Sequence, residues 1–171
     1  MLPQSKNILI TGMQGSGKSY LAKKFAEAGY KTVDADTIDG LSAWYDANGQ
    51  PATLDMTRDK DWLDAHRYLW NRNFLSTYLD THKPIVFCGS SSNTMEMLDL
   101  FDEAYYLKVP TNIILQRLIA HDRENSFGST AEQQATVAAR VTGSDELMQS
   151  YPITILDGTQ TPEELLKIIL G

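Results

Sequence analysis

The sequence predicts an α/β fold built on a parallel β-sheet of about five strands. Segments of strand type and helix type alternate along the chain, which is the pattern of parallel strands joined by helical crossovers. A glycine-rich turn over residues 12–17 joins the first strand to the first helix. The length of 171 residues suits one domain with its own core. We therefore expect a single domain over residues 1–171.

The first elements follow from apolar spacing. We expect a strand over Asn7–Thr11, a helix over Lys18–Ala28 that ends at Gly29, and a second strand over Lys31–Asp36. The helix has one buried face, because its apolar residues recur three or four positions apart. These residues are Leu21, Ala22, Phe25 and Ala28.

The next segment is organised around a turn. Asn48-Gly49-Gln50-Pro51 is a strong turn signal, so we expect a short helix before it and a loop after it. Residues 61–79 then fit a long amphipathic helix. Its apolar face would consist of Trp62, Leu63, Tyr68, Leu69, Phe74, Leu75 and Tyr78.

The second half of the chain continues the alternation, and its last helix carries a capping box with Thr161 as N-cap and Glu164 at N3. The expected elements are a strand over Ile85–Cys88, a short helix from Asn93 or Thr94 toward Leu100, a strand over Ala104–Lys108, a helix over Thr111–Ala120, a polar loop over His121–Thr130, a helix over Ala131–Met148 with a break near Gly143, a strand over Pro152–Leu156 and the final helix.

Composition limits the partners. Acidic residues outnumber basic ones, 22 to 15, and the formal net charge is −7, which disfavours nucleic-acid polymers and anionic membranes. Cys88 is the single cysteine, so no intramolecular disulfide can form, which fits a reducing compartment. No stretch approaches the roughly 18 apolar residues of a membrane span, and no signal peptide is visible. We expect a cytoplasmic protein.

The glycine-rich turn carries the strongest functional signal. Residues 12–19, Gly-Met-Gln-Gly-Ser-Gly-Lys-Ser, fit G-x-x-x-x-G-K-[ST] at every position. This spacing lets backbone N–H groups point inward at a phosphate, and the helix N-terminus adds partial positive charge. Lys18 can bridge the β- and γ-phosphates and Ser19 can bind Mg²⁺. The predicted nucleotide-binding residues here are Gly12, Gly15, Ser16, Gly17, Lys18, Ser19 and Tyr20.

The sequence does not support the other classes of nucleotide-binding protein that contain such a glycine-rich turn. A GTPase would add an Asn-Lys-x-Asp motif, and the sequence has none. Motor-type and AAA-type ATPases are disfavoured because no apolar strand ends in a suitable Asp. The strand Ile85–Cys88 ends in Cys-Gly, and Asp157 lies near the C-terminus and runs into Gly158-Thr159, so we do not assign it to Mg²⁺.

On these motifs the chain resembles the small P-loop kinases, which include shikimate kinase, gluconate kinase and adenylate kinase. The resemblance covers most of the chain and implies a three-layer P-loop NTPase fold, with a five-stranded parallel sheet in the order 2-3-1-4-5 flanked by helices. It also implies an acceptor-binding segment at about residues 37–80 and a small lid at about 121–131. The segments that carry it are residues 12–19, 33–36, 87–90, 106–110, 116–118 and 155–159.

The resemblance also implies roles for two aspartates at the end of the second strand. Asp34 and Asp36 are two residues apart, so they point to the same side. In kinases of the shikimate type, the first such Asp holds the acceptor hydroxyl and takes its proton, and the second lies near Mg²⁺. Carried over, Asp34 is the acceptor-positioning base and Asp36 is an outer-shell Mg²⁺ ligand, with Asp39 ranked behind them.

Further residues match family positions on the ATP side. Arg117 matches the arginine that stacks on adenine, and Gly158 and Thr159 lie where the family wraps the adenine edge with backbone. Arg123 falls where the family has its lid, and would neutralise charge on the transferring phosphoryl group. Arg140, on the following helix, is the second candidate for that cation.

The chain departs from the family around the acceptor. Kinases of the shikimate type have three glycines after the third strand, where this chain has Gly89-Ser90-Ser91-Ser92, which makes shikimate itself doubtful. The lid lacks a run of arginines. An anionic acceptor would need one or more of Arg58, Arg67 and Arg72. The aromatic residues of this segment either stack a base or sugar or form a helix core; among them are Trp44, Tyr45 and Trp62.

The motif and the resemblance lead to two candidate functions. The first is a Mg²⁺-dependent kinase that uses ATP and acts on a small molecule, either a shikimate-like or sugar-acid hydroxyl or a nucleoside monophosphate. In it, Lys18 and Arg123 stabilise the phosphoryl group, Ser19 and Asp36 hold Mg²⁺, and Asp34 orients the acceptor. The alternative is an ATP-binding module or slow NTPase that acts through a protein partner on residues 42–70. We expect a monomer, as in the family.

Overall fold

The computed structural model of the protein describes residues 6–55, 59–120 and 130–171. Most of the expected lid, including Arg123, lies outside these residues. The elements in chain order are β1 (Asn7–Gly12), α1 (Lys18–Glu27), β2 (Thr32–Asp34), the 3₁₀ helix η1 (Ala35–Thr37), β3 (Ser42–Tyr45), β4 (Pro51–Ala52), α2 (Lys60–Ala65), β5 (Arg67–Trp70), α3 (Arg72–His82), β6 (Ile85–Cys88), the 3₁₀ helix η2 (Thr94–Leu100), β7 (Glu103–Lys108), α4 (Thr111–Ile119), α5 (Ala131–Met148), β8 (Thr154–Asp157) and α6 (Pro162–Leu170).

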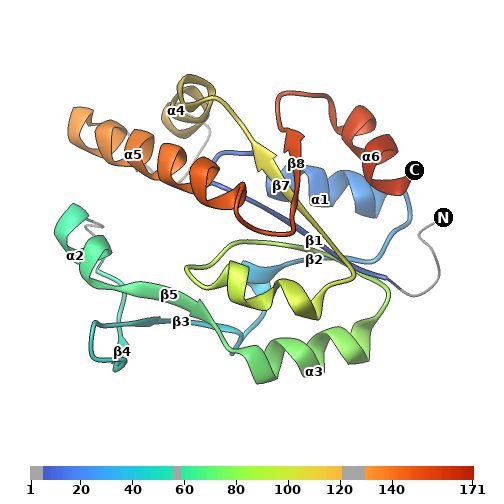
Figure 1. Cartoon of the computed structure of the whole chain (residues 1–171), viewed down its shortest axis with the longest axis horizontal. Coiled ribbons are helices and arrows are strands. Elements are labelled where there is room, and N and C mark those ends of the chain that lie inside the picture. Colours follow the sequence, from blue (N-terminus) through green and yellow to red (C-terminus); the bar gives the residue numbers. More distant parts are fainter. Residues whose placement is uncertain (1–5, 56–58, 121–129) are drawn as a thin grey trace.

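Five parallel strands form the central sheet in the order β2-β6-β1-β7-β8 (Figure 1). Numbered among themselves along the chain, they stand in the order 2-3-1-4-5, so the expected sheet is confirmed. β1 lies at the centre, with Ile10 beside Cys88 of β6 and Gly12 beside Leu107 of β7. The strand order reverses at β1, and ligands of open parallel sheets bind beyond the carboxyl ends of the strands at such a point.

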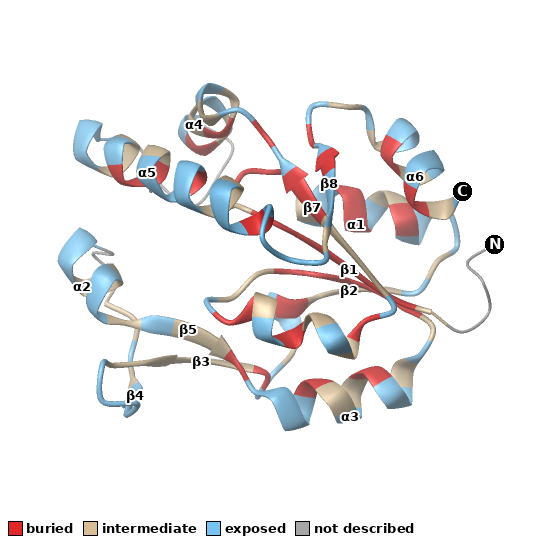
Figure 2. Ribbon diagram, viewed as in Figure 1, coloured by how far each residue is buried: buried red, intermediate tan, exposed pale blue. Residues whose placement is uncertain are grey.

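The strands of this sheet contribute side chains to two hydrophobic cores, one on each face of the sheet, because successive residues of a strand point to opposite faces. Ile8 and Ile10 of β1 pack with residues of α1 and α6, and Leu9 between them packs with residues of α3 and η2. Figure 2 shows β1 buried along its length between these helical layers. α4 and α5 pack against each other in a third, smaller core. Among the described residues, no helix is both long and apolar enough to cross a membrane.

The segment after β2 differs from the expected helix and loop. β3, β4 and β5 form a separate antiparallel sheet in the order β4-β3-β5. Gly49 has a φ of +76° and turns the chain between β3 and β4, which is what an Asn-Gly pair does in a hairpin. The Asp46 carboxylate accepts the N–H groups of Asn48 and Gln50 and holds this turn. We call the described residues from Ser42 to Trp70 the arm (Figure 1).

The expected long helix over residues 61–79 was also wrong. α2 ends at Ala65, the chain then pairs with β3 as β5, and α3 begins only after Asn71. The Asn71 side chain accepts the N–H of Phe74 and caps the new helix. Tyr68-Leu69-Trp70 is a run of strand-forming type, and its pairing with β3 outweighs the helical spacing of its apolar residues.

Two glycines provide a matched test of stability. A Cβ on Gly89, which follows β6, would lie 2.4 Å from Ala35 Cβ and 3.1 Å from the Trp70 ring. We expect Gly89→Ala to destabilise the protein by about 1–3 kcal/mol, the usual cost of overpacking a core. Gly143 lies within α5, which continues through it without the expected break, and a Cβ there would meet no described atom within 4 Å outside the backbone of its own helix.

Gly143→Ala should therefore stabilise the protein by about 0.5–1 kcal/mol through helix propensity. Chemical denaturation of both variants measures the two changes in the free energy of unfolding. Changes of the same sign would contradict the packing that we describe around Gly89.

Candidate active site

The phosphate loop, residues 12–19, connects β1 to α1. Gly15 and Gly17 have φ angles of +85° and +97°, a backbone conformation that side chains rarely adopt. Gly17 is the N-cap of α1, so the N-terminus of this helix faces the loop. Ser16 donates its N–H to Met13 O at 3.0 Å, and its buried hydroxyl has no hydrogen-bond partner among the described residues. The loop thus has the form of a phosphate cradle.

Lys18 and Ser19 lie at the first turn of α1. Lys18 Nζ donates to Gly12 O at 2.7 Å and to Met13 O at 3.0 Å, which holds the ammonium group over the loop. Ser19 Oγ donates to Asp34 Oδ2 at 2.8 Å. This hydrogen bond joins the phosphate loop to the end of β2.

The two aspartates have different surroundings. Asp34 accepts the Asp36 N–H on its Oδ1 at 3.0 Å while its Oδ2 binds Ser19. Asp36 Oδ1 accepts a long hydrogen bond of 3.4 Å from the Tyr68 hydroxyl, on the arm. Partial burial raises the pKa of Asp36, and the neighbouring Asp34 carboxylate raises it further. One aspartate therefore faces the phosphate loop, and the other faces the arm.

The raised pKa of Asp36 predicts a pH-dependent cost in stability. A raised pKa means that folding favours the protonated carboxyl, so this contribution is fully present below the ordinary pKa and is lost as the pH rises through the raised one. We expect Asp36→Asn to raise the Tm at pH 7 by roughly 1–2 °C, a small effect because solvent reaches the side chain. The difference should vanish near pH 4. Thermal melts at both pH values test this, and an equal gain at both would contradict it.

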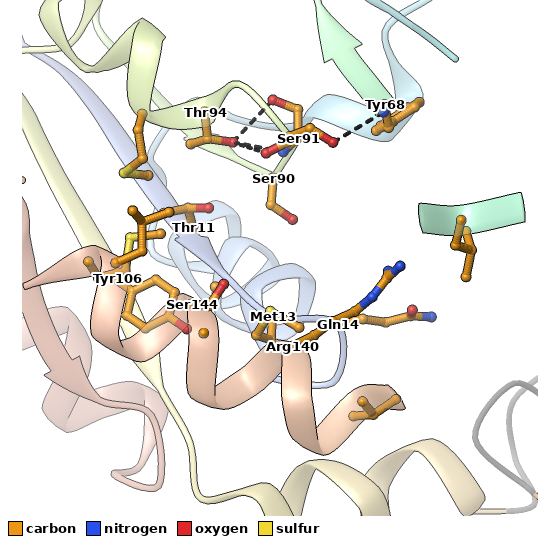
Figure 3. A pocket seen from close by; sticks show the side chains of 18 of the residues that line it. Thr11, Met13, Gln14, Tyr68, Ser90, Ser91, Thr94, Tyr106, Arg140 and Ser144 are labelled. Carbon is orange, nitrogen blue, oxygen red and sulfur yellow. Dashed lines mark hydrogen bonds between the residues drawn. The ribbon is translucent and has the colours of Figure 1, made fainter. Parts of the chain in front are cut away.

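Two adjoining cavities open from this centre. The first, of about 570 Å³, is lined by the phosphate loop, both aspartates, the arm and Ser90, and we call it the transfer cavity. The second, of about 530 Å³, reaches from the phosphate loop to α5, and we call it the inner cavity. Figure 3 shows Ser90, Ser91 and Thr94 facing Arg140 and Ser144 across it. The residues common to both cavities are Gln14, Trp44, Leu63, Tyr68, Ser90 and Arg140.

The arginines suggested by the sequence as contacts for the phosphoryl group or the acceptor differ in whether they line the two cavities. Arg140 lines both cavities, and its Nη2 lies 3.7 Å from Asp64 Oδ1 on the arm. Arg67 pairs with Glu96 at 3.8 Å, Arg72 binds both oxygens of Asp99, and neither residue lines the two cavities. Arg58 lies outside the described residues, as Arg123 does.

The residues expected around adenine lie near the phosphate loop or β8 and line neither cavity; they are Arg117, Gly158 and Thr159. Arg117 Nη1 donates to Gly15 O at 3.1 Å, so its guanidinium lies against the phosphate loop. Gly158 follows β8 and donates its N–H to Lys108 O, and Thr159 is held by the Asp157 carboxylate. Tyr20, predicted together with the phosphate loop, is 57% exposed and lines the transfer cavity.

Several residues of the site were not assigned to it from the sequence. Trp44 and Tyr68 line both cavities; the sequence left Trp44 open between a stacking residue and a helix-core residue, and it assigned Tyr68 to the apolar face of a helix. Ser144, on α5, lines the inner cavity and belonged to no motif, and Tyr106, on β7, lines it too but was singled out only as part of the 106–110 segment, with no role in the site. The Asn-Gly turn was the signal that could have revealed the arm as a hairpin.

The described residues fit a Mg²⁺–nucleotide complex. They contain no group of three or more His, Cys, Asp and Glu side chains that could hold a metal ion by itself. Mg²⁺ at phosphate sites usually takes one or two protein oxygens and completes its shell with phosphates and water. The Ser19 hydroxyl and the adjacent Asp34 carboxylate offer such oxygens beside the cradle.

Comparisons with known proteins agree with this architecture. A family model described as an AAA domain matches residues 8–135, so the sequence-based argument that disfavoured AAA-type proteins was wrong. The mistake came from requiring an Asp at the end of an apolar strand. No curated protein matches the chain.

Several solved structures are similar over nearly the whole chain. A shikimate kinase from Acinetobacter baumannii in complex with shikimate is 18% identical, with a TM-score of 0.64 and coverage of 97% of this chain and 93% of that one. A gluconokinase from Sinorhizobium meliloti 1021 is 15% identical, with a TM-score of 0.54 and coverage of 98% and 90%. A deoxyadenosine kinase from M. mycoides with bound dATP is 14% identical, with a TM-score of 0.54 and coverage of 95% and 96%.

At these identities the likeness shows the fold, and it confirms the resemblance to the small P-loop kinases at that level. The chain belongs to the AAA domain family and has the fold of the small P-loop kinases.

Proposed function

We propose that the protein transfers the γ-phosphoryl group of ATP, in the presence of Mg²⁺, to a hydroxyl group of a small molecule. The observation that carries this proposal is that the phosphate loop and the Asp34–Asp36 pair line one cavity, with the arm as its opposite wall. The kinases among the similar structures act in the same chemical class, to judge from their names. A module that only bound ATP would not need the inner cavity beside the phosphate loop.

Phosphoryl transfer relies mainly on positioning and on neutralisation of charge. Lys18 would contact the phosphates and stabilise charge on the transferring group, and Ser19 would hold Mg²⁺. When bound, Mg²⁺–ATP supplies the phosphoryl group and part of the charge neutralisation. Arg140 is the described cation proposed to face the transferring group, with Arg123 as the alternative. Residues proposed on the adenine side are Arg117, Gly158 and Thr159, and Tyr20 is proposed to contact the nucleotide beside the phosphate loop.

For the two aspartates we propose roles opposite to those that the resemblance implied. Asp34 is hydrogen-bonded to Ser19, so it lies where the water shell of a Mg²⁺ ion on Ser19 would be. Asp36 faces the arm, and its raised pKa makes its carboxylate a better proton acceptor than an ordinary aspartate. Asp36 would take the proton of the acceptor hydroxyl as the oxygen bonds to phosphorus, and Asp34 would support the metal.

The experiment is ADP release from Mg²⁺–ATP with and without acceptors from four classes: nucleosides, nucleoside monophosphates, shikimate, and sugar acids such as gluconate. We expect strong stimulation by members of one class. ATP turnover that no acceptor stimulates, together with a protein partner bound to the arm, would instead support the ATP-binding module. A monomeric state and a cytoplasmic location stay predictions from the sequence.

A further inference from the structure

Two aromatic side chains of the arm form one wall of both cavities. Trp44 of β3 and Tyr68 of β5 are direct partners in the antiparallel ladder, and their ring centroids lie 5.2 Å apart. Directly opposite residues of such a ladder project from the same face of the sheet. We call this pair the aromatic platform.

The aromatic platform is not part of a hydrophobic core. None of the three core clusters of the described residues includes Trp44 or Tyr68, and both side chains are half-buried. Trp62 packs against Trp44 with ring centroids 5.0 Å apart, and His66 stacks on Trp62 at 3.9 Å, so further rings buttress the platform. A supported aromatic surface on a cavity wall is typical of a site for a flat or apolar ligand.

The aromatic platform adjoins the proposed chemistry. The Tyr68 hydroxyl donates to Asp36, the proposed base, and both residues line the transfer cavity with Lys18. A ring stacked on the platform would therefore hold an attached hydroxyl group near Asp36. This geometry favours an acceptor with a ring at one end and a reactive hydroxyl group at the other.

The inner cavity opposite the platform offers space and uncharged partners. Its volume of about 530 Å³ lies within the range of small-molecule sites. Ser90, Ser91 and Ser144 present hydroxyl groups on two sides of it (Figure 3). Met95, Leu147 and Met148 add apolar surface. Such a lining recognises the polar edge and the faces of an uncharged ring.

The charges around the inner cavity disfavour an acceptor with several negative charges. Among its described lining residues, Arg140 carries the one permanent positive charge, and it lies 3.7 Å from Asp64. Asp34 and Asp36 add negative charge at the transfer end. A phosphate dianion in the inner cavity would thus meet one arginine that already lies beside Asp64, while Lys18 at the transfer end is shared with two carboxylates.

We propose that the acceptor is a nucleoside: an uncharged, planar base that stacks on the aromatic platform, joined to a sugar whose hydroxyl group reaches Asp36. This inference rests on the proposed function and specifies its substrate class. In the transfer, the sugar oxygen bonds to the γ-phosphorus, the bond from that phosphorus to the bridging oxygen of ADP breaks, and the hydroxyl proton passes to Asp36.

Direct binding tests the inference apart from turnover. The protein is first saturated with Mg²⁺ and a non-hydrolysable ATP analogue, so that added nucleosides cannot enter the ATP site. Adenosine, guanosine, cytidine and thymidine are then titrated by calorimetry. We expect at least one to bind, and we expect Trp44→Ala to weaken it by about 5- to 100-fold, the usual range for loss of base stacking.

Two further variants separate stacking from a general effect on the arm. Trp44→Phe keeps a ring and should restore most of the affinity. Tyr45→Ala removes the neighbouring aromatic residue, which projects from the opposite face of β3 and lines neither cavity, and should change the affinity by less than about twofold. Unchanged affinity for the ATP analogue shows that each variant is folded.

The outcomes distinguish the two proposals. If no nucleoside binds at millimolar concentration, or if Trp44→Ala and Tyr45→Ala weaken binding equally, the nucleoside inference is overturned. If shikimate, gluconate or a nucleoside monophosphate then stimulates ADP release, the proposed phosphoryl transfer still stands. If no class of acceptor stimulates it, the proposed function fails as well.

Discussion

Phosphoryl transfer should fall by about 10²–10³-fold in Lys18→Ala, and the affinity for ATP should fall with it. Lys18 Nζ is held over the phosphate loop by Gly12 O and Met13 O, so its charge is in place before a nucleotide arrives. Preorganised charges of this kind stabilise a transition state at little cost of rearrangement. ADP release with a saturating acceptor gives the rate, and a fluorescent ATP analogue gives the affinity.

Lys24→Ala is the matched control for this variant. Lys24 lies on the same helix, but it lines neither cavity, and its ammonium group pairs with Glu27 and lies over the Tyr20 ring. Its removal should change transfer by less than about twofold, because exposed pairs of this kind contribute little. An unchanged affinity for ATP in Lys18→Ala would overturn the assignment of residues 12–19 as a phosphate loop.

The parts of the molecule that were predicted well are those in which local pattern decides the structure. β6 was expected at Ile85–Cys88 and lies there, because its residues are apolar on both faces and the flanking residues break the strand. The capping box at Thr161 is present with Glu164 at N3. The phosphate loop likewise depends on adjacent glycines and on the helix that follows it.

The arm could not be predicted in this way, since its structure depends on distant pairing. Trp44 and Tyr68 are 24 residues apart in the sequence and become partners only in the β3–β5 ladder. Each apolar residue of β5 also fits a helical spacing, so periodicity alone favoured a helix over residues 61–79. The cavity wall that these rings form therefore had no sequence signature.

The aspartate pair lies between these cases. Both carboxylates line the transfer cavity, but β2 ends at Asp34 and Asp36 lies in η1, so the strand alternation used to put them on one side does not apply. Which of them faces the metal depends on Ser19 of α1, and which faces the acceptor depends on Tyr68 of the arm. Those partners are set by the tertiary fold, so the proposed division of roles could not be drawn from the sequence alone.

Separate replacement of the two aspartates should distinguish loss of the proton acceptor from loss of support for Mg²⁺. In Asp36→Asn, the loss of the proposed base should lower kcat by about 10²–10⁴-fold, while the Mg²⁺ requirement and ATP affinity stay unchanged. In Asp34→Asn, the Mg²⁺ concentration for half-maximal rate should rise by about 10–100-fold, and high Mg²⁺ should restore much of the rate. Asp39→Asn is the control, because Asp39 is exposed and lines neither cavity.

The pH profile provides the decisive readout for Asp36. Its raised pKa means that the wild-type kcat should decline as the pH falls through that pKa, because a protonated carboxyl cannot accept the hydroxyl proton. Asp36→Asn should lose this decline and be slow at every pH, while Asp34→Asn at high Mg²⁺ should keep it. The opposite pattern, with the decline lost in Asp34→Asn, would restore the roles that the resemblance implied. Since Asp36→Asn is also expected to be more stable at pH 7, a loss of activity in that variant would reflect chemistry and not unfolding.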